Sequence, residues 1–183
     1  NIQNNQISNE SEENNMYSTG KHHAEIVVKN YGTIALELDA DVAPITVENF
    51  ANLVNEGFYN GLTFHRIISG FMIQGGDPLG NGTGGSSKTI KGEFASNGVK
   101  NSISHVRGTI SMARSSMPNS ASSQFFIVHQ DSTFLDGKYA AFGTVTSGME
   151  VVDKICADTA VEDDNGTVAK NNQPVIEKIT IID

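Results

Sequence analysis

Short β-rich runs separated by turn residues constrain the fold of this 183-residue chain more than any other feature of the sequence. Runs of about four to eight β-branched, aromatic and aliphatic residues, bounded by Gly, Asn or Ser, are typical of strands. The runs are AEIVVK (24–29), TIALEL (33–38), LTFHRII (62–68), FMIQGG (71–76), GTISMA (108–113), SQFFIVH (123–129), YAAFGTV (139–145) and PVIEKITIID (174–183). The first two runs are joined at Asn30-Tyr31-Gly32, which predicts a β-hairpin.

One segment between these runs has helical spacing instead. Its apolar side chains recur at i, i+3, i+4 and i+7, and they are Val47, Phe50, Ala51 and Val54. Pro44 lies near the first turn, where a missing N–H group costs little, and Glu48 favours the positive end of the helix dipole. Gly57 is a suitable stop. The pattern therefore predicts a helix that begins near Pro44 and ends before Gly57.

A second helix is predicted late in the chain. Ser147 and Glu150 have the spacing of a capping box, and Val152, Ile155 and Cys156 would face inward. About eight short strands, two helices and Gly-rich connections indicate a mainly β fold, a closed eight-stranded antiparallel β-barrel capped by two α-helices. The sequence contains no internal repeats.

The N-terminal segment differs in composition from the rest. Residues 1–20 are rich in Asn, Ser and Glu with few apolar side chains, and they cannot bury enough surface to offset the entropy of ordering. We expect a flexible polar tail at 1–20, order from near Ala24, and a single domain at 21–183. The tail is either a tether to a membrane anchor or a ragged native terminus.

The prediction of the cellular compartment rests mainly on the composition of this tail. The tail favours an extracytoplasmic, membrane-anchored lipoprotein, and a cytoplasmic protein is the alternative. The single cysteine, Cys156, fits a reducing compartment or an exported protein without disulfides. The sequence starts at Asn1 rather than Met, which is consistent with removal of an upstream segment. A hydrophobic segment ending in Cys in the upstream coding sequence would settle the compartment.

Charge and the generic motifs exclude several functions. The net charge of −9 argues against a nucleic-acid partner, because phosphates need a basic surface. Gly80–Gly85 matches G-x-G-x-x-G, but no helical sequence follows it, so it is not a dinucleotide site. The pair His22-His23 and the acidic run 162–164 lack the spacing of metal ligands, so no metal is expected. For His65, His105 and His129 a structural role is the default.

One group of neighbouring residues suggests a catalytic site. Phe64-His65-Arg66-Ile67-Ile68 is followed closely by the run from Phe71 to Gly76. If the two runs form neighbouring strands, Arg66 and Gln74 meet on one face beside Phe71 and Met72. That arrangement places a guanidinium at the edge of an apolar pocket.

Five sequence blocks resemble the cyclophilin family in the family's order. The blocks are FHRIISGFMIQGGD, NGTGG, ISMA, SQFFI and FLDGKYAAFG, and the resemblance covers roughly residues 24–183. The resemblance is to a bacterial-like member. It implies an eight-stranded barrel with two capping helices and an active site on its outer face. It also implies peptidyl-prolyl cis-trans isomerisation without a cofactor.

The resemblance further implies roles for individual residues. Arg66 would act on the twisted amide, Gln74 would orient it, and Phe71 would complete the catalytic set. The other residues implied to bind substrate are Met72, Gly82, Ala113, Arg114, Ser115, Gln124, Phe126, Phe134, Leu135 and Tyr139. Within that set, Phe71, Met72, Phe126 and Leu135 would form the proline pocket. Arg114 would bind the substrate backbone through its main chain.

Three positions depart from the best-known eukaryotic pattern of the family. Arg114 replaces Asn, Phe134 replaces Trp and Tyr139 replaces His, and the stretch 114–123 is a residue longer. The implied partners are proline-containing peptides and unfolded protein clients, with weak binding of cyclosporin-type ligands. We expect a monomer.

Two other classes of function compete with the isomerase. A proline-peptide binding module or holdase on the same scaffold needs only the pocket, so retention of Arg66 and Gln74 favours the enzyme. A hydrolase on a β-barrel has no nucleophile–base signature in this sequence.

Overall fold

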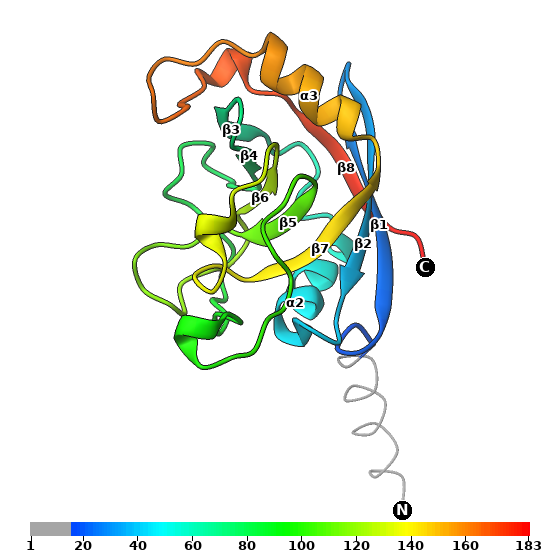
Figure 1. The fold of residues 1–183 in the computed structure, drawn as a ribbon. Coiled ribbons are helices and arrows are strands. Elements are labelled where there is room, and N and C mark those ends of the chain that lie inside the picture. The colour runs from blue at the N-terminus through cyan, green and yellow to red at the C-terminus, as the bar shows by residue number, and fades with distance from the viewer. Residues whose placement is uncertain (1–15) are drawn as a thin grey trace, which may run out of the picture.

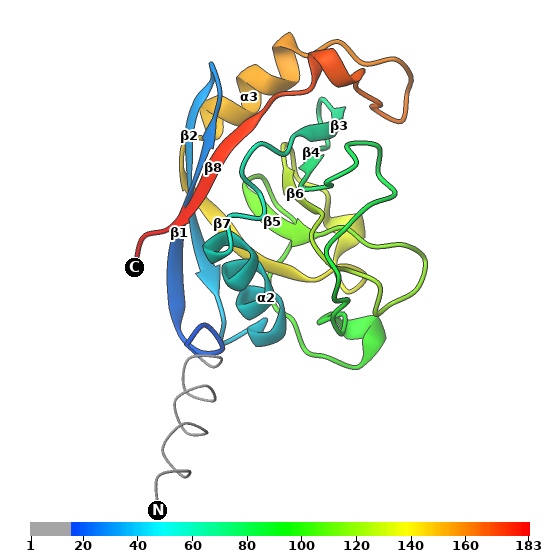
Figure 2. The same cartoon turned by 180° about the vertical axis from the view of Figure 1, so that it is seen from behind.

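Eight antiparallel strands form one sheet that curls on itself in the computed structural model, which describes residues 16–183 (Figures 1 and 2). The sheet order is β3-β4-β6-β5-β7-β2-β1-β8. The bounds are β1 (Lys21–Val28), β2 (Gly32–Asp39), β3 (Phe64–Ile68), β4 (Met72–Gly75), β5 (Thr109–Met112), β6 (Phe125–Val128), β7 (Ala141–Ser147) and β8 (Ile176–Ile181). The predicted strand runs are confirmed.

The two end strands of this order, β3 and β8, come together only at one end. Thr63 and Val175, just before the two strands, form an isolated antiparallel bridge. The Phe64 N–H donates to the carbonyl of Pro174 at 3.0 Å. The predicted eight-stranded antiparallel fold is therefore correct, while "closed" slightly overstates how completely the last two strands pair.

The β1–β2 hairpin follows from its sequence pattern. Ala24, Ile26 and Val28 of β1 are buried, and the residues between them are exposed or half-buried, which is the alternation of a strand with one face in a core. Asn30 in the turn (φ 67°) and Gly32 at the start of β2 (φ 122°) have positive φ, a conformation that Gly adopts without strain and that Asn adopts more often than most residues. The predicted hairpin is confirmed.

Helix α2 (Pro44–Asn55) lies at one end of the curled sheet (Figure 1), and the predicted apolar stripe is buried. Its N-terminus is stabilised by a residue that the sequence pattern missed. The buried carboxylate of Glu93 accepts hydrogen bonds from the N–H groups of Ile45 (3.3 Å) and Thr46 (2.7 Å). Glu48 lies beyond the first turn, which contains no acidic residue. Glu93 therefore supplies the negative charge that the helix dipole favours there.

Helix α3 (Met149–Asp158) lies at the opposite end of the sheet (Figures 1 and 2). The capping-box prediction was wrong, because Ser147 is the last residue of β7 and the N-cap is Gly148, at φ 92° and without a side-chain cap. A left-handed turn replaces the side-chain cap, and glycine adopts it without strain. The inward-facing residues Val152, Ile155 and Cys156 are buried as predicted.

Strands β4 and β6 present apolar side chains on both faces. Ile73, Phe125 and Ile127 belong to the large cluster inside the sheet, together with Phe50 and the other core residues. A second cluster forms on the outer face of the same strands, and it consists of Met72, Phe126, Val128 and Leu135, with Ile68, Phe71, Ala113 and Tyr139 packed around it. Apolar side chains therefore pack on both faces of the sheet here, and the outer cluster is a candidate wall for a binding pocket.

The N-terminal boundary differs in detail from the expectation. Strand β1 begins at Lys21, earlier than Ala24, and residues 16–20 form turns against the domain. Tyr17 packs against the core, and its hydroxyl accepts a hydrogen bond from the Asn55 amide at 2.9 Å. Residues 1–15, where most of the predicted tail falls, lie outside the described residues. Among residues 16–183, no helix combines the length and apolar character needed to cross a bilayer.

Candidate active site

Antiparallel pairing brings Arg66 and Gln74 together. The two residues are direct partners across β3 and β4, and the Arg66 Nη1 donates to the Gln74 Oε1 at 3.3 Å. The predicted meeting of these side chains on one face of the sheet is confirmed.

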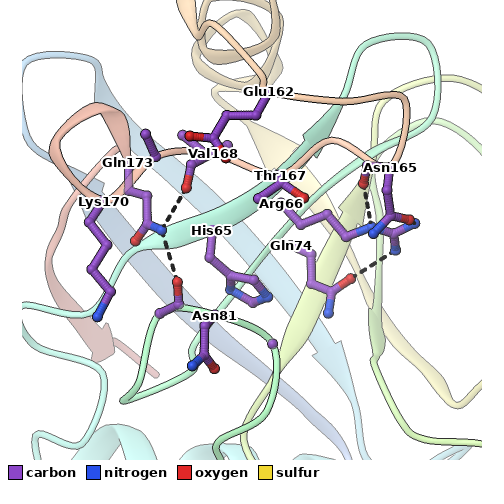
Figure 3. Close-up of a pocket in the computed structure, with 13 residues that line it drawn as sticks. His65, Arg66, Gln74, Asn81, Glu162, Asn165, Thr167, Val168, Lys170 and Gln173 are labelled. Carbon is purple, nitrogen blue, oxygen red and sulfur yellow. Dashed lines mark hydrogen bonds between the residues drawn. The ribbon is translucent and has the colours of Figure 1, made fainter.

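A second partner fixes Arg66, and sequence reasoning missed it. The Arg66 Nε donates to the carbonyl of Asn165 at 2.8 Å, and Nη2 donates to the Asn165 Oδ1 at 3.1 Å (Figure 3). Thr167 forms a β-bridge with Arg66, and the Asp163 carboxylate accepts from the Thr167 N–H at 3.1 Å. The acidic run 162–164 shows no functional pattern in the sequence, but the loop 162–167 that contains it contacts Arg66 and is part of the site.

Gln74 is itself held by a hydrogen bond to Gln124, which precedes β6. Its Nε2 donates to the Gln124 Oε1 at 2.9 Å. The Gln124 Nε2 in turn donates to the carbonyls of Gly82 (3.1 Å) and Gly84 (2.8 Å). Desolvation lowers the pKa of Arg66, but its ordinary value is so high that the guanidinium stays charged near neutral pH. A charged donor group is thus held by uncharged amides and carbonyls.

Arg66 stands at the edge of a small apolar pocket of about 130 Å³. Its lining is Arg66, Phe71, Met72, Gln74, Ala113, Arg114, Phe126, Leu135 and Tyr139. All nine are residues that the sequence resemblance implied. Three of them, Met72, Phe126 and Leu135, belong to the outer apolar cluster, and three more, Phe71, Ala113 and Tyr139, pack around it.

The remaining implied residues lie next to this pocket. Gly82, Ser115 and Gln124 line a neighbouring pocket of about 210 Å³, which shares Gln74, Ala113 and Arg114 with the first. Phe134 lines neither pocket: the residue is 65% exposed, and its ring centroid lies 5.6 Å from that of Phe71. The structure therefore gathers the implied residues around two adjoining pockets, with Phe134 at the rim.

Phe126 is supported from behind by a buried histidine. The His105 ring stacks on it with the centroids 6.0 Å apart. His105 Nδ1 donates to Asp136 at 2.9 Å, and because burial lowers the pKa of His105, the neutral ring accepts from the Ser111 hydroxyl through Nε2 at 2.9 Å. Ser111 and His105 are both buried, so this Ser-His-Asp set meets no substrate and orients the pocket wall.

His129 has a structural role as well. Its Nδ1 accepts from the Gly70 N–H at 2.8 Å, so Nε2 carries the proton and donates to Asp153 at 2.9 Å. The His129 N–H donates to the carbonyl of Phe71 at 2.8 Å. These bonds fix the turn that leads into Phe71 and link it to helix α3.

The Gly-rich segment at 80–85 binds a carboxylate of its own chain. The Asp77 carboxylate accepts from the N–H groups of Leu79 (2.9 Å), Asn81 (3.2 Å) and Gly82 (2.7 Å), and these bonds contribute to lowering the pKa of Asp77. No helix follows the segment. The helix that the dinucleotide motif requires directly after its glycines is therefore missing here.

A third and larger cavity of about 590 Å³ lies on the other side of Arg66, between the loops at 80–82 and 162–173 (Figure 3). His65 projects toward it, and both of its ring nitrogens are buried without a hydrogen-bond partner. Burial lowers the pKa of His65. In the part of the chain that the structure describes, no cluster of His, Cys, Asp and Glu could hold a metal ion.

Comparison with known proteins points to one family. The family profile "Cyclophilin type peptidyl-prolyl cis-trans isomerase/CLD" matches residues 23–182. A peptidyl-prolyl cis-trans isomerase of Helicobacter pylori (strain ATCC 700392 / 26695) is 51% identical over 128 residues, which is 69% of this chain and 76% of that protein. Peptidyl-prolyl cis-trans isomerase B of Bacillus subtilis (strain 168) is 50% identical over 117 residues, or 64% of this chain and 78% of that protein.

Solved structures agree with the sequence relatives. The crystal structure of a Cryptosporidium parvum cyclophilin type peptidyl-prolyl cis-trans isomerase in the presence of the dipeptide Ala-Pro has a TM-score of 0.77 and 32% sequence identity. The match covers 88% of this chain and 99% of that one.

The buried His65 predicts a pH-dependent stability. Because its folded-state pKa lies below the unfolded value of about 6.5, the unfolded chain binds a proton that the folded chain does not, once the pH falls below that value. The free energy of unfolding should therefore fall on acidification below pH ~6.5, by up to about 1.4 kcal/mol per pH unit from this group. Urea unfolding between pH 7.5 and 5 measures this, and His65→Leu should flatten the dependence. An unchanged slope in His65→Leu would contradict the assignment.

Proposed function

The chain belongs to the cyclophilin-type peptidyl-prolyl cis-trans isomerase family, and we propose that Arg66 is the residue that accelerates rotation about the Xaa-Pro bond. The protein is a peptidyl-prolyl cis-trans isomerase, an enzyme that assists protein folding. The observation that carries the proposal is the guanidinium of Arg66, held by Gln74 and Asn165 at the edge of an apolar pocket.

The reaction sets the requirement for the site. Rotation about the bond has a barrier of about 18–20 kcal/mol, which comes from amide resonance, while the cis and trans forms differ by only about 0.5–1 kcal/mol. The enzyme must therefore stabilise the twisted amide rather than either isomer. No covalent bond breaks, so the reaction needs neither a nucleophile nor a cofactor.

Arg66 has the chemistry that a twisted amide needs. Rotation decouples the nitrogen lone pair from the carbonyl, so the nitrogen becomes a better hydrogen-bond acceptor as the transition state is approached. The bonds to Gln74 and Asn165 use one N–H group on each terminal nitrogen, which leaves a second N–H group on each for the substrate. A planar guanidinium held in this way gains a hydrogen bond only as rotation proceeds.

The apolar pocket suits the proline ring. Its volume of about 130 Å³ is below the roughly 300–1,000 Å³ of sites that hold whole small molecules, so it accommodates a single side chain. Phe71, Met72, Phe126 and Leu135 surround that volume with apolar surface and exclude water from the amide. A water-poor surrounding strengthens the Arg66 hydrogen bond and disfavours the polar, planar amide.

Arg66→Ala is the direct test of this role. A charge-assisted hydrogen bond contributes about 1.5–3 kcal/mol, so kcat/KM for a Xaa-Pro peptide should fall about tenfold to hundredfold. The exposed Lys178 on β8, away from both pockets, provides the control Lys178→Ala, which should retain activity. Near-normal turnover by a folded Arg66→Ala variant would remove Arg66 from the mechanism.

Phe134 bears on inhibitor binding rather than on catalysis. We propose that cyclosporin-type ligands bind weakly, because Phe134 is an exposed ring at the rim and lacks the N–H donor of an indole. Phe134→Trp should therefore tighten inhibition by about one to two decades, the equivalent of one hydrogen bond and some apolar contact. Titration of the isomerase activity of both proteins with the drug measures this. Tight inhibition of the unaltered protein, or no gain from Trp, would disprove the role of Phe134.

Other parts of the functional account stay predictions. Proline-containing peptides are bound by the family, and we propose unfolded polypeptides with exposed Xaa-Pro bonds as the clients of this chain. The monomeric state is a prediction from sequence. The extracytoplasmic, lipid-anchored location depends on residues 1–15, outside the described part of the chain.

A further inference from the structure

Arg114 lies on the wall shared by the two adjoining pockets. The sequence resemblance implies only a main-chain role for this residue. We propose that the Arg114 side chain, together with Arg66, makes the enzyme select Xaa-Pro segments that carry an acidic side chain within two residues of the proline. The inference rests on the proposed function, because it names the substrate class of the same site.

The guanidinium of Arg114 is fixed in place. It lies between the rings of Phe94 and Tyr139, with its central carbon 4.7 and 4.8 Å from the two ring centroids. Its Nε and Nη2 donate to the carbonyl of Lys138 at 3.0 and 2.6 Å, and Nη1 donates to the carbonyl of Ser115 at 3.0 Å. A side chain stacked and bonded in this way presents its charge at one place without further loss of rotamer freedom.

The charge of Arg114 is not neutralised. Its hydrogen-bond acceptors are main-chain carbonyl oxygens, and among residues 16–183 it takes part in no ion pair within 4.0 Å. Arg66 is similar, since its acceptors are the side-chain amides of Gln74 and Asn165 and a carbonyl. Asp163 acts on Arg66 from the loop behind it and lines neither pocket.

The two pockets are therefore positive on an acidic protein. Among the described residues that line them, two are arginines and none carries a carboxylate, although the chain as a whole has a net charge of −9. A cleft lined by charges of one sign focuses the field and attracts ligands of the opposite sign.

The wall that the two pockets share determines which residue of the peptide lies near the charge of Arg114. A proline in the 130 Å³ pocket has its chain neighbours about 3.3–3.6 Å per residue away, and the second pocket adjoins the first along Gln74, Ala113 and Arg114. A residue one or two positions from the proline thus passes beside Arg114. A glutamate there is attracted by both guanidinium groups, and a lysine is repelled.

The test compares matched peptides. Xaa-Pro peptides with Glu, Gln or Lys at each position within two residues of the proline are assayed by exchange NMR at low salt. At one position or more, kcat/KM should be about two- to tenfold higher for Glu than for Gln, and lower for Lys. The preference should shrink at about 0.5 M salt, where the screening length drops well below 10 Å.

Three variants separate charge from packing. Arg114→Met keeps a long apolar side chain against Phe94 and Tyr139. It should bring the Glu-to-Gln ratio most of the way to one, and Arg66 accounts for the part that remains. Arg114→Lys keeps the charge and should preserve the ratio, even where its overall activity falls. Lys178→Met removes one positive charge on the exposed side of β8, away from both pockets, and should leave the ratio unchanged.

The outcomes distinguish this inference from the proposed function. Equal turnover of Glu and Gln peptides at every position would overturn the selection of acidic segments while leaving the isomerase intact. Loss of the ratio in Arg114→Lys, or an undiminished ratio in Arg114→Met, would also overturn it, because the charge of Arg114 would not then be its source. Failure to accelerate exchange in any peptide would overturn the proposed function itself.

Discussion

The hydrogen bonds that hold the guanidinium of Arg66 are the constraint on which the site depends. Gln74 approaches from the neighbouring strand and Asn165 from a loop that pairs with the outer edge of β3. The bonds to Asn165, at 2.8 and 3.1 Å, are shorter than the 3.3 Å bond to Gln74. The loop therefore helps to orient Arg66, and one N–H group on each terminal nitrogen is not used by these bonds.

The sheet makes this orientation durable because its strands are packed on both faces. On β4 and β6, the inward side chains join a core centred on rings such as Phe50 and Phe125, while Met72 and Phe126 line the pocket outside. A shift of either strand would disturb two apolar clusters at once. The buried His105, stacked behind Phe126, adds a polar support to the same wall. Rigid support of this kind is what electrostatic stabilisation of a transition state requires.

The sequence was informative wherever neighbours along the chain determine the structure. Period-two and helical patterns predicted the hairpin at Asn30 and helix α2, and the short spacing of β3 and β4 predicted that Arg66 meets Gln74. It failed where partners are remote: Glu93 stabilises the start of α2 from 47 residues away, and Asn165 reaches Arg66 across 99 residues. No local sequence pattern marks either partner, because only the tertiary fold brings it near. The stacking of Arg114 on Phe94 was hidden for the same reason.

The most direct measurement of the central claim is the rate of cis-trans exchange of a peptide bound to Arg66→Lys. Lysine keeps the positive charge but lacks the planar fork that Gln74 and Asn165 orient. NMR exchange spectroscopy at saturating peptide separates this rate from the affinity. The account predicts that the affinity stays close to that of the unaltered enzyme. The exchange rate should fall at least about tenfold, since at least one hydrogen bond to the twisted amide is lost. Exchange as fast as in the unaltered enzyme would contradict it, because charge alone would then suffice.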